Sequence, residues 1–170
     1  YARWFFAHET AHFWMGQRVR YERSRDAWIT EGSADAMAYW GLKALDPAYD
    51  PRPAYQKSVD DCVKLTTGKA LATAEERGAH RGYYACGLIF HLLADGVMRK
   101  TGQDGFDFLR RLIEANTDGV VTRADWLKAV KDAGASDAAV ADIEALIYTG
   151  AASPEDLIAR LLTEAGVPFR

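Results

Sequence analysis

The residues HETAH at positions 8–12 constrain this chain more than any other feature. Residues four positions apart on a helix share one face about one turn apart, so the imidazoles of His8 and His12 can reach a single ion. Glu31, in WITEGSAD, can supply a third ligand from a following helix. Three protein ligands leave one position of a tetrahedral zinc ion open for water, which distinguishes catalytic from structural zinc. The spacing therefore predicts the zinc site of a metal-dependent hydrolase.

The alternative is an exposed helix whose two histidines are ordinary polar residues. The surrounding sequence favours the metal site. The segment before the motif is apolar and has no Gly or Pro, which favours a buried helix, and no helix breaker follows until Gly16. Glu31 precedes an apolar, helix-compatible run over residues 34–45, which an Asp-Pro pair ends.

A 33-residue stretch beginning at His8 resembles the zinc-binding core of the aminopeptidase N family of gluzincin peptidases, which includes leukotriene hydrolase: HETAHFWMGQRVRYERSRDAWITEGSADAMAYW. That family has HExxH, then eighteen residues, then Glu, and eighteen residues also separate His12 from Glu31. The resemblance implies that His8, His12 and Glu31 bind zinc. It also implies that Glu9 is the general base, which takes a proton from water and delivers it to the leaving amine. The alternative for Glu9 is an ordinary solvent-facing helix residue.

A shorter match lies in RGYYACGLIFHLL, residues 81–93. The family has a Tyr three residues before a Gly at the start of a long helix, and the Tyr hydroxyl helps to bind the oxyanion. Tyr84, three residues before Gly87, matches this position, and the resemblance implies the same role for it. Tyr83 is a competing candidate. The chain departs from the family at Cys86, where a Lys is usual.

Two aspartates are candidates to orient the ligands. Zinc-bound histidines usually donate their second ring N–H to a carboxylate or carbonyl. Asp35 lies four residues after Glu31 and shares its helical face, and EGSAD resembles the Glu-xxx-Asp pair of thermolysin-like enzymes. Asp26 is the second candidate, and capping or surface positions are the alternative for both. The other two histidines, His80 and His91, have no assignable partner and are expected to be structural or exposed.

The composition is that of a globular domain. A chain of 170 residues with 49% hydrophobic residues can bury a sizeable core. The formal net charge of −3 gives no reason to expect a nucleic-acid partner, and acidic residues interrupt the arginines of segment 18–25, which favours a solvated loop or hairpin. No apolar run approaches the roughly 20 residues of a membrane span. Cys62 and Cys86 form no CxxC motif and are either a disulfide or two buried thiols.

Helical patterns cover nearly the whole chain, and no convincing domain boundary interrupts them. Thr122 with Asp125 predicts a capping box, and Ser153-Pro154 predicts another helix start. Helices are expected at about residues 2–15, 31–44, 83–100, 105–115 and 137–147, between Pro53 and about Thr67, and after Thr122 and Ser153, with residues 17–25 extended or looped. Residues 1–170 are thus expected to form a single, mainly α unit. The resemblance implies that this unit is an excerpt, the helical C-terminal part of a thermolysin-like zincin catalytic domain without its preceding β-rich portion.

These observations lead to the expectation of a zinc-dependent peptidase, most consistent with an aminopeptidase, with one Zn²⁺ per chain. Its partners would be a peptide substrate and the rest of the parent catalytic domain, and we expect little activity from this chain alone. The alternative is a gluzincin-like binding or scaffold module that has lost activity, motivated by Cys86 and the two candidate tyrosines. The presence of all three zinc ligands and of Glu9 favours the peptidase.

Overall fold

The computed structural model describes residues 2–168, and their fold is mainly α, as predicted. The helices in this range are α1 (Ala2–Ala11), α2 (Trp28–Leu45), α3 (Arg52–Thr66), α4 (Arg81–Arg99), α5 (Gly105–Ala115), α6 (Arg123–Asp132), α7 (Asp137–Tyr148) and α8 (Pro154–Ala165). Two short 3₁₀ turns, η1 (Ser24–Asp26) and η2 (Leu71–Thr73), lie in the connections. Strands β1 (Arg20–Tyr21) and β2 (Val120–Val121) form one short parallel pair, with Arg20 opposite Val120.

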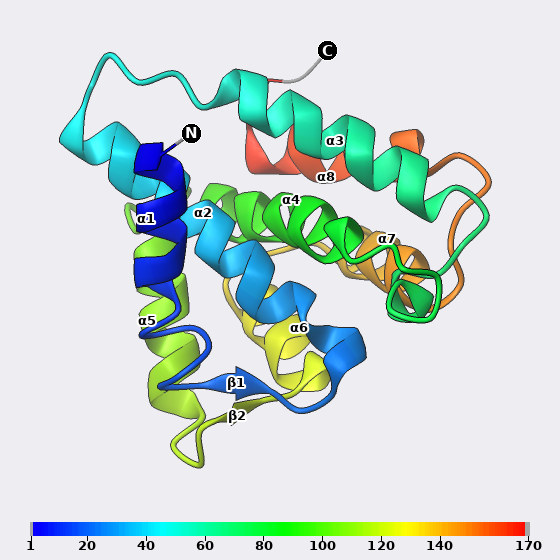
Figure 1. Ribbon diagram of the computed structural model, residues 1–170, viewed down its shortest axis with the longest axis horizontal. Helices are drawn as coiled ribbons and strands as arrows, with labels where there is room; N and C mark the ends of the chain where they lie inside the picture. The colour runs from blue at the N-terminus through cyan, green and yellow to red at the C-terminus, as the bar shows by residue number, and fades with distance from the viewer. Residues whose placement is uncertain (1, 169–170) are drawn as a thin grey trace.

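Helix α4 is the centre of the fold. Every residue from Ala85 to Met98 is buried, and a helix that is apolar nearly all round can be stable only when other elements surround it. Helices α2, α3, α5 and α8 pack against it (Figure 1). Helix α1 packs on α2, so the HETAH segment reaches the core through the helix that carries Glu31.

Two features fix α4 to its neighbours. Where α2 crosses α4, Gly32 and Gly87 bring the two backbones into contact: a Cβ on Gly32 would lie 2.3 Å from the carbonyl carbon of Gly87. One residue earlier, Cys86 forms a disulfide with Cys62 of α3, which decides between the two alternatives left open for these cysteines. The position where the resembling family usually has Lys is therefore occupied by a cross-link between helices.

Helix α1 differs from its prediction in length and in burial. It ends at Ala11 instead of Met15, because residues 12–19 form tight turns and a bridge between Met15 and Val19. It was expected to be buried, yet Phe5 and Phe6 are 42% and 68% exposed, and Phe13 and Trp14 beyond the helix are also exposed. Only the face with His8 and Ala11 is buried.

The other helix boundaries follow local signals. Helix α6 begins with the predicted capping box: Thr122 accepts from the backbone N–H of Asp125, whose carboxylate accepts from the backbone N–H of Thr122. Asp104 and Asp107 form a second capping box at α5. Helix α8 begins with Pro154 as its first residue, but the Ser153 side chain makes no capping bond. Helix α2 starts at Trp28, three residues before the predicted Glu31.

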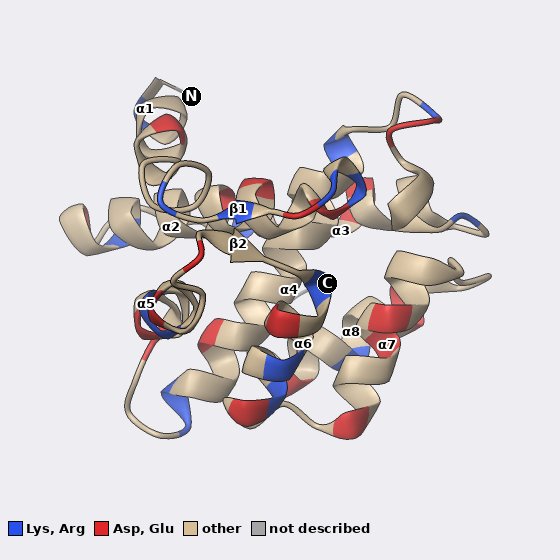
Figure 2. Ribbon diagram, turned by 90° about the horizontal axis from the view of Figure 1, so that it is seen from below, with Lys and Arg blue, Asp and Glu red and all other residues tan. Residues whose placement is uncertain are grey.

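Charges of both signs are distributed over the outer helices (Figure 2). The arginine-containing segment 18–25 is extended at β1 and turns at η1, in agreement with the predicted extended or looped conformation, although its strand pairs in parallel with β2 and forms no hairpin. Within residues 2–168, no helix is both long and apolar enough to cross a membrane.

Candidate metal centre

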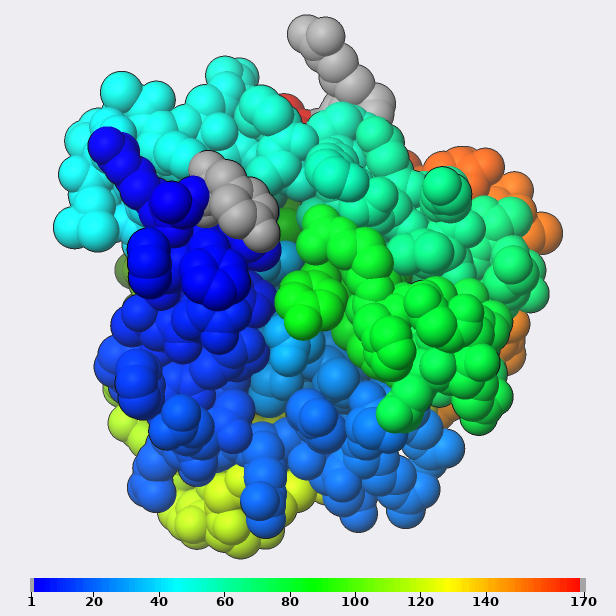
Figure 3. All heavy atoms as spheres, viewed as in Figure 1, coloured from blue at the N-terminus to red at the C-terminus, as the bar shows by residue number. Residues whose placement is uncertain are grey.

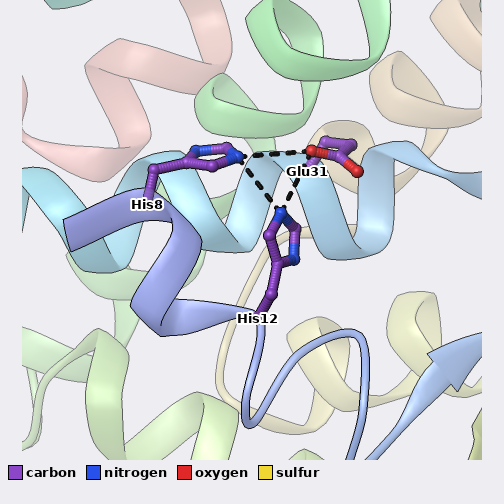
Figure 4. Close-up of side chains that lie close together, drawn as sticks. All are labelled: His8, His12 and Glu31. Carbon is purple, nitrogen blue, oxygen red and sulfur yellow. Dashed lines mark hydrogen bonds and ion pairs between the residues drawn. The ribbon is translucent and has the colours of Figure 1, made fainter. Parts of the chain in front are cut away.

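Helices α1 and α2 bring the three predicted ligands together (Figure 4). The Nε2 atoms of His8 and His12 are 3.2 Å apart, and each lies 3.4 Å from Oε2 of Glu31. His8 lies in α1 and His12 is the first residue after it, and the four-residue spacing still brings the two imidazoles to the same side. Glu31 reaches them from the first turn of α2.

Each imidazole is held by a second contact that turns Nε2 toward the cluster. Nδ1 of His8 lies 2.9 Å from Oδ1 of Asp35, one turn along α2 from Glu31. Asp35 therefore occupies the position predicted for a residue that orients a ligand. Its other oxygen, Oδ2, is buried and has no hydrogen-bond partner among the described residues.

His12 is oriented by the backbone. Its Nδ1 lies 2.9 Å from the carbonyl oxygen of Met15, in the turn that ends α1. The next residue, Gly16, has φ +147°, and a Cβ there would lie 3.1 Å from Nδ1 of His12. A side chain at Gly16 would strain the backbone and crowd the imidazole. The sequence does not indicate this contact, because every residue has a backbone carbonyl and any residue at position 15 could accept the bond.

The donor set fits a tetrahedral cation. Carboxylate and carbonyl oxygens only accept hydrogen bonds, so Nδ1 of both histidines must donate, and each neutral ring then has a lone pair on Nε2. When both rings are neutral, two such lone pairs and a carboxylate oxygen face one another and can bind one cation. Zinc bonds of about 2.0–2.1 Å place neighbouring tetrahedral ligand atoms about 3.3–3.4 Å apart, close to the 3.2, 3.4 and 3.4 Å that separate these three atoms.

The close approach of these three side chains shifts the pKa of each one. Burial lowers the pKa of His8, but hydrogen bonds to Asp35 and Glu31 outweigh burial and raise it to about 9. The hydrogen bond to Glu31 raises the pKa of His12. Burial raises the pKa of Glu31, yet the two histidines prevail and lower it to about 2. The cluster thus attracts positive charge, from protons or from a metal ion.

Glu9, the predicted general base, lies on α1 between the two ligands and is exposed to solvent. Among the described residues its side chain forms no hydrogen bond or ion pair. Its charge is one of the smaller causes that raise the pKa of Tyr84.

The structure distinguishes the two candidate tyrosines. The ring of Tyr84 stacks on that of His8, with centroids 5.7 Å apart, and Tyr84 also interacts with Glu31. Burial, followed by the charge of Glu31 and a hydrogen bond with it, raises the pKa of Tyr84 to about 12. Tyr83 is directed elsewhere, since its hydroxyl accepts from the backbone N–H of Glu75 at 3.2 Å.

Asp26 is not brought to the histidines. Its Oδ1 accepts from Nε of Arg123 at 2.8 Å, and both side chains are buried. This pair joins the segment before α2 to the start of α6, so Asp26 stabilises the segment that leads to Glu31 and does not contact a ligand. The partner lies 97 residues away, which no local sequence pattern indicates.

The remaining histidines have separate environments. His91 is fully buried in α4 and lies between the carbonyl of Gly87 and the indole of Trp126. His80 is exposed at the start of α4. The only group of three or more His, Cys, Asp or Glu residues within residues 2–168 whose atoms could hold a metal ion is His8, His12 and Glu31. Comparisons with protein-family models, curated proteins and solved structures found no match.

Proposed function

We propose that this chain carries the zinc site and the catalytic groups of a zinc-dependent peptidase, most consistent with an aminopeptidase. One observation carries the proposal: the spacing of two Nε2 atoms and a carboxylate oxygen is close to that around a tetrahedral zinc ion, and an oxygen acceptor at each Nδ1 leaves both Nε2 atoms for the metal. Three ligands leave a coordination position for chemistry, which favours a catalytic over a structural site.

The proposed roles follow from position. Zinc in such a site supplies Lewis acidity toward water and toward a carbonyl. Glu9 accepts a proton from the attacking water and returns it to the leaving amine, and its exposure leaves it free to do so. Tyr84 keeps its proton at neutral pH, as an ordinary phenol does and more so because its pKa is raised to about 12, so its hydroxyl donates a hydrogen bond where negative charge develops on the substrate oxygen.

The resemblance also implies a β-rich portion that aligns the peptide and holds its free amino end. In the proposed enzyme the helical unit binds the metal, and efficient turnover also requires the β-rich portion. The 170-residue chain alone is expected to bind zinc and to cleave peptides poorly.

The test separates metal binding from catalysis. Zinc per chain is measured by elemental analysis after dialysis against zinc-containing and then zinc-free buffer, with an expected value near one. Glu31→Gln removes a ligand and should lose the metal. Glu9→Gln should retain the metal and, in a polypeptide that includes the β-rich portion, lose about 10²–10⁴-fold in turnover. Zinc near zero in the unmodified chain, or full turnover by Glu9→Gln, would contradict the proposal.

A further inference from the structure

A pocket of about 230 Å³ opens beside the proposed metal site. It shares Glu31 and Tyr84 with that site, so a group bound in it lies next to the reacting bond. Figure 3 shows a depression between the blue N-terminal helix α1 and the green residues around the start of α4, with the lighter blue α2 at its floor. The pocket is lined by Tyr21, Ser24, Ala27, Glu31, Glu75, His80, Tyr83 and Tyr84.

Three phenol rings form much of the lining. Tyr21 comes from β1, and Tyr83 and Tyr84 come from the first turn of α4. Tyr83 is buried and is fixed by the hydrogen bond from the Glu75 backbone N–H, while Tyr21 and Tyr84 are half-buried. The faces of aromatic rings carry partial negative charge and attract cations.

Glu75 supplies a full negative charge. Its Oε2 accepts from the hydroxyl of Ser24 at 2.5 Å, a bond that holds the carboxylate at the pocket without neutralising it. Within residues 2–168 no Lys or Arg lies within ion-pair distance of Glu75.

Two arginines near the start of α4 have other partners. Arg77 donates to the carbonyls of Leu65 and Ala70. Arg81 donates to Asp61 at 2.9 Å and lies against the face of Tyr84, 5.9 Å from its ring centroid. Glu75 is therefore an exposed carboxylate without an ion-pair partner among residues 2–168, beside aromatic walls, and no Lys or Arg belongs to the lining of the pocket.

We propose that this pocket binds a cationic side chain, that of lysine or arginine, on the substrate residue next to the scissile bond. The ammonium or guanidinium pairs with Glu75 while its aliphatic stem contacts the tyrosine rings. The inference rests on the proposed function for the identity of the ligand as a substrate residue, and its test does not require catalysis.

The test compares N-acetyl-lysine methylamide with N-acetyl-norleucine methylamide, which lacks only the amine. Binding of each is followed by ¹H–¹⁵N chemical-shift titration of the full chain, with and without zinc. The lysine compound is expected to bind at least about tenfold more tightly, with the largest shifts at Tyr21, Glu75 and Tyr84. Glu75→Gln retains an acceptor for Ser24 and should reduce the ratio of affinities to near one.

Glu76→Gln is the matched control, since it removes the charge of an exposed neighbour outside the pocket lining and should leave the ratio unchanged. Equal affinities in the unmodified chain would overturn the inference, as would a ratio that Glu75→Gln does not alter. A chain that binds no zinc yet prefers the lysine compound would refute the proposed function and retain the cation pocket. A chain that binds zinc but shows no preference for the lysine compound would refute the cation pocket and leave the proposed function standing.

Discussion

Asp35 holds His8 through a hydrogen bond of 2.9 Å, and both side chains are almost completely buried. The two residues belong to different helices and are 27 positions apart. The contact therefore connects the orientation of a ligand to the packing of α1 on α2. Solvent contributes little at this depth, so the Asp35 carboxylate keeps a proton on Nδ1 of His8 and leaves Nε2 facing Glu31.

Replacing Asp35 with Asn should weaken zinc binding about 10–100-fold, because an amide polarises the imidazole less and can present its N–H to Nδ1. Competition against a chromophoric chelator measures this. Asp46→Asn is the control, at a partly exposed aspartate just beyond α2 whose ion-pair partner is Arg3, and it should change zinc affinity little. Unchanged zinc affinity in the Asp35 variant would show that the contact does not orient the metal ligand.

Zinc affinity should depend on pH through His8. In the metal-free chain its pKa is raised to about 9, so His8 carries a proton at neutral pH that zinc must displace. The apparent affinity should therefore rise about tenfold per pH unit for each proton released as pH increases from 6 to 8, and fall in the opposite direction. Chelator competition at several pH values, corrected for titration of the chelator, tests this. A flat profile would mean that the ligands are already deprotonated.

The crossing of α2 and α4 should tolerate no side chain. Gly32→Ala places a methyl group 2.3 Å from backbone, which the helices can accommodate only by moving apart, and should lower the free energy of unfolding by about 1–3 kcal/mol or more. Gly41→Ala, in the same helix with open space around its Cβ, should be neutral or stabilise by up to about 1 kcal/mol. Denaturant unfolding of both variants makes the comparison, and equal stabilities would contradict the close approach.

His91 should make the fold sensitive to acid. Its Nδ1 donates to Gly87, so Nε2 accepts from the indole N–H of Trp126 at 3.1 Å, and protonating Nε2 would oppose two donors. Burial lowers the pKa of His91 to about 4, below its value of about 6.5 in an unfolded chain. The unfolded state binds more protons between these values, so stability is fully present above pH 6.5 and falls by about 3 kcal/mol as pH decreases to 4.

Unfolding of His91→Gln over this pH range isolates that contribution, because glutamine can make both hydrogen bonds and does not titrate. His80→Gln, at the surface, should retain the slope of the unmodified chain. His8 should add little slope below pH 6.5, since it is protonated in both states there. The idea fails if the pH dependence of His91→Gln matches that of the unmodified chain.

Most of the helices could be predicted because caps, helix breakers and apolar periodicity act within a few residues of each helix. Thr122 and Asp125 form the predicted capping box, and the four-residue spacing brings His8 and His12 together although His12 lies just past the end of α1. The predicted end of α1 was wrong because the chain turns after Ala11 and Met15 pairs with Val19, although the sequence has no helix breaker before Gly16. The partner of Asp26 and the pairing of Cys62 with Cys86 depend on tertiary packing, and a single sequence records neither.

Because of the disulfide between α3 and α4, the covalent structure of a sample depends on the redox conditions under which the protein was produced. Disulfides form in oxidising conditions and are kept reduced in most cytosols. Two batches of identical sequence, one produced in each environment, are therefore different covalent molecules, and they differ two residues from Tyr84. Every zinc affinity measured on this protein should be accompanied by a count of its free thiols.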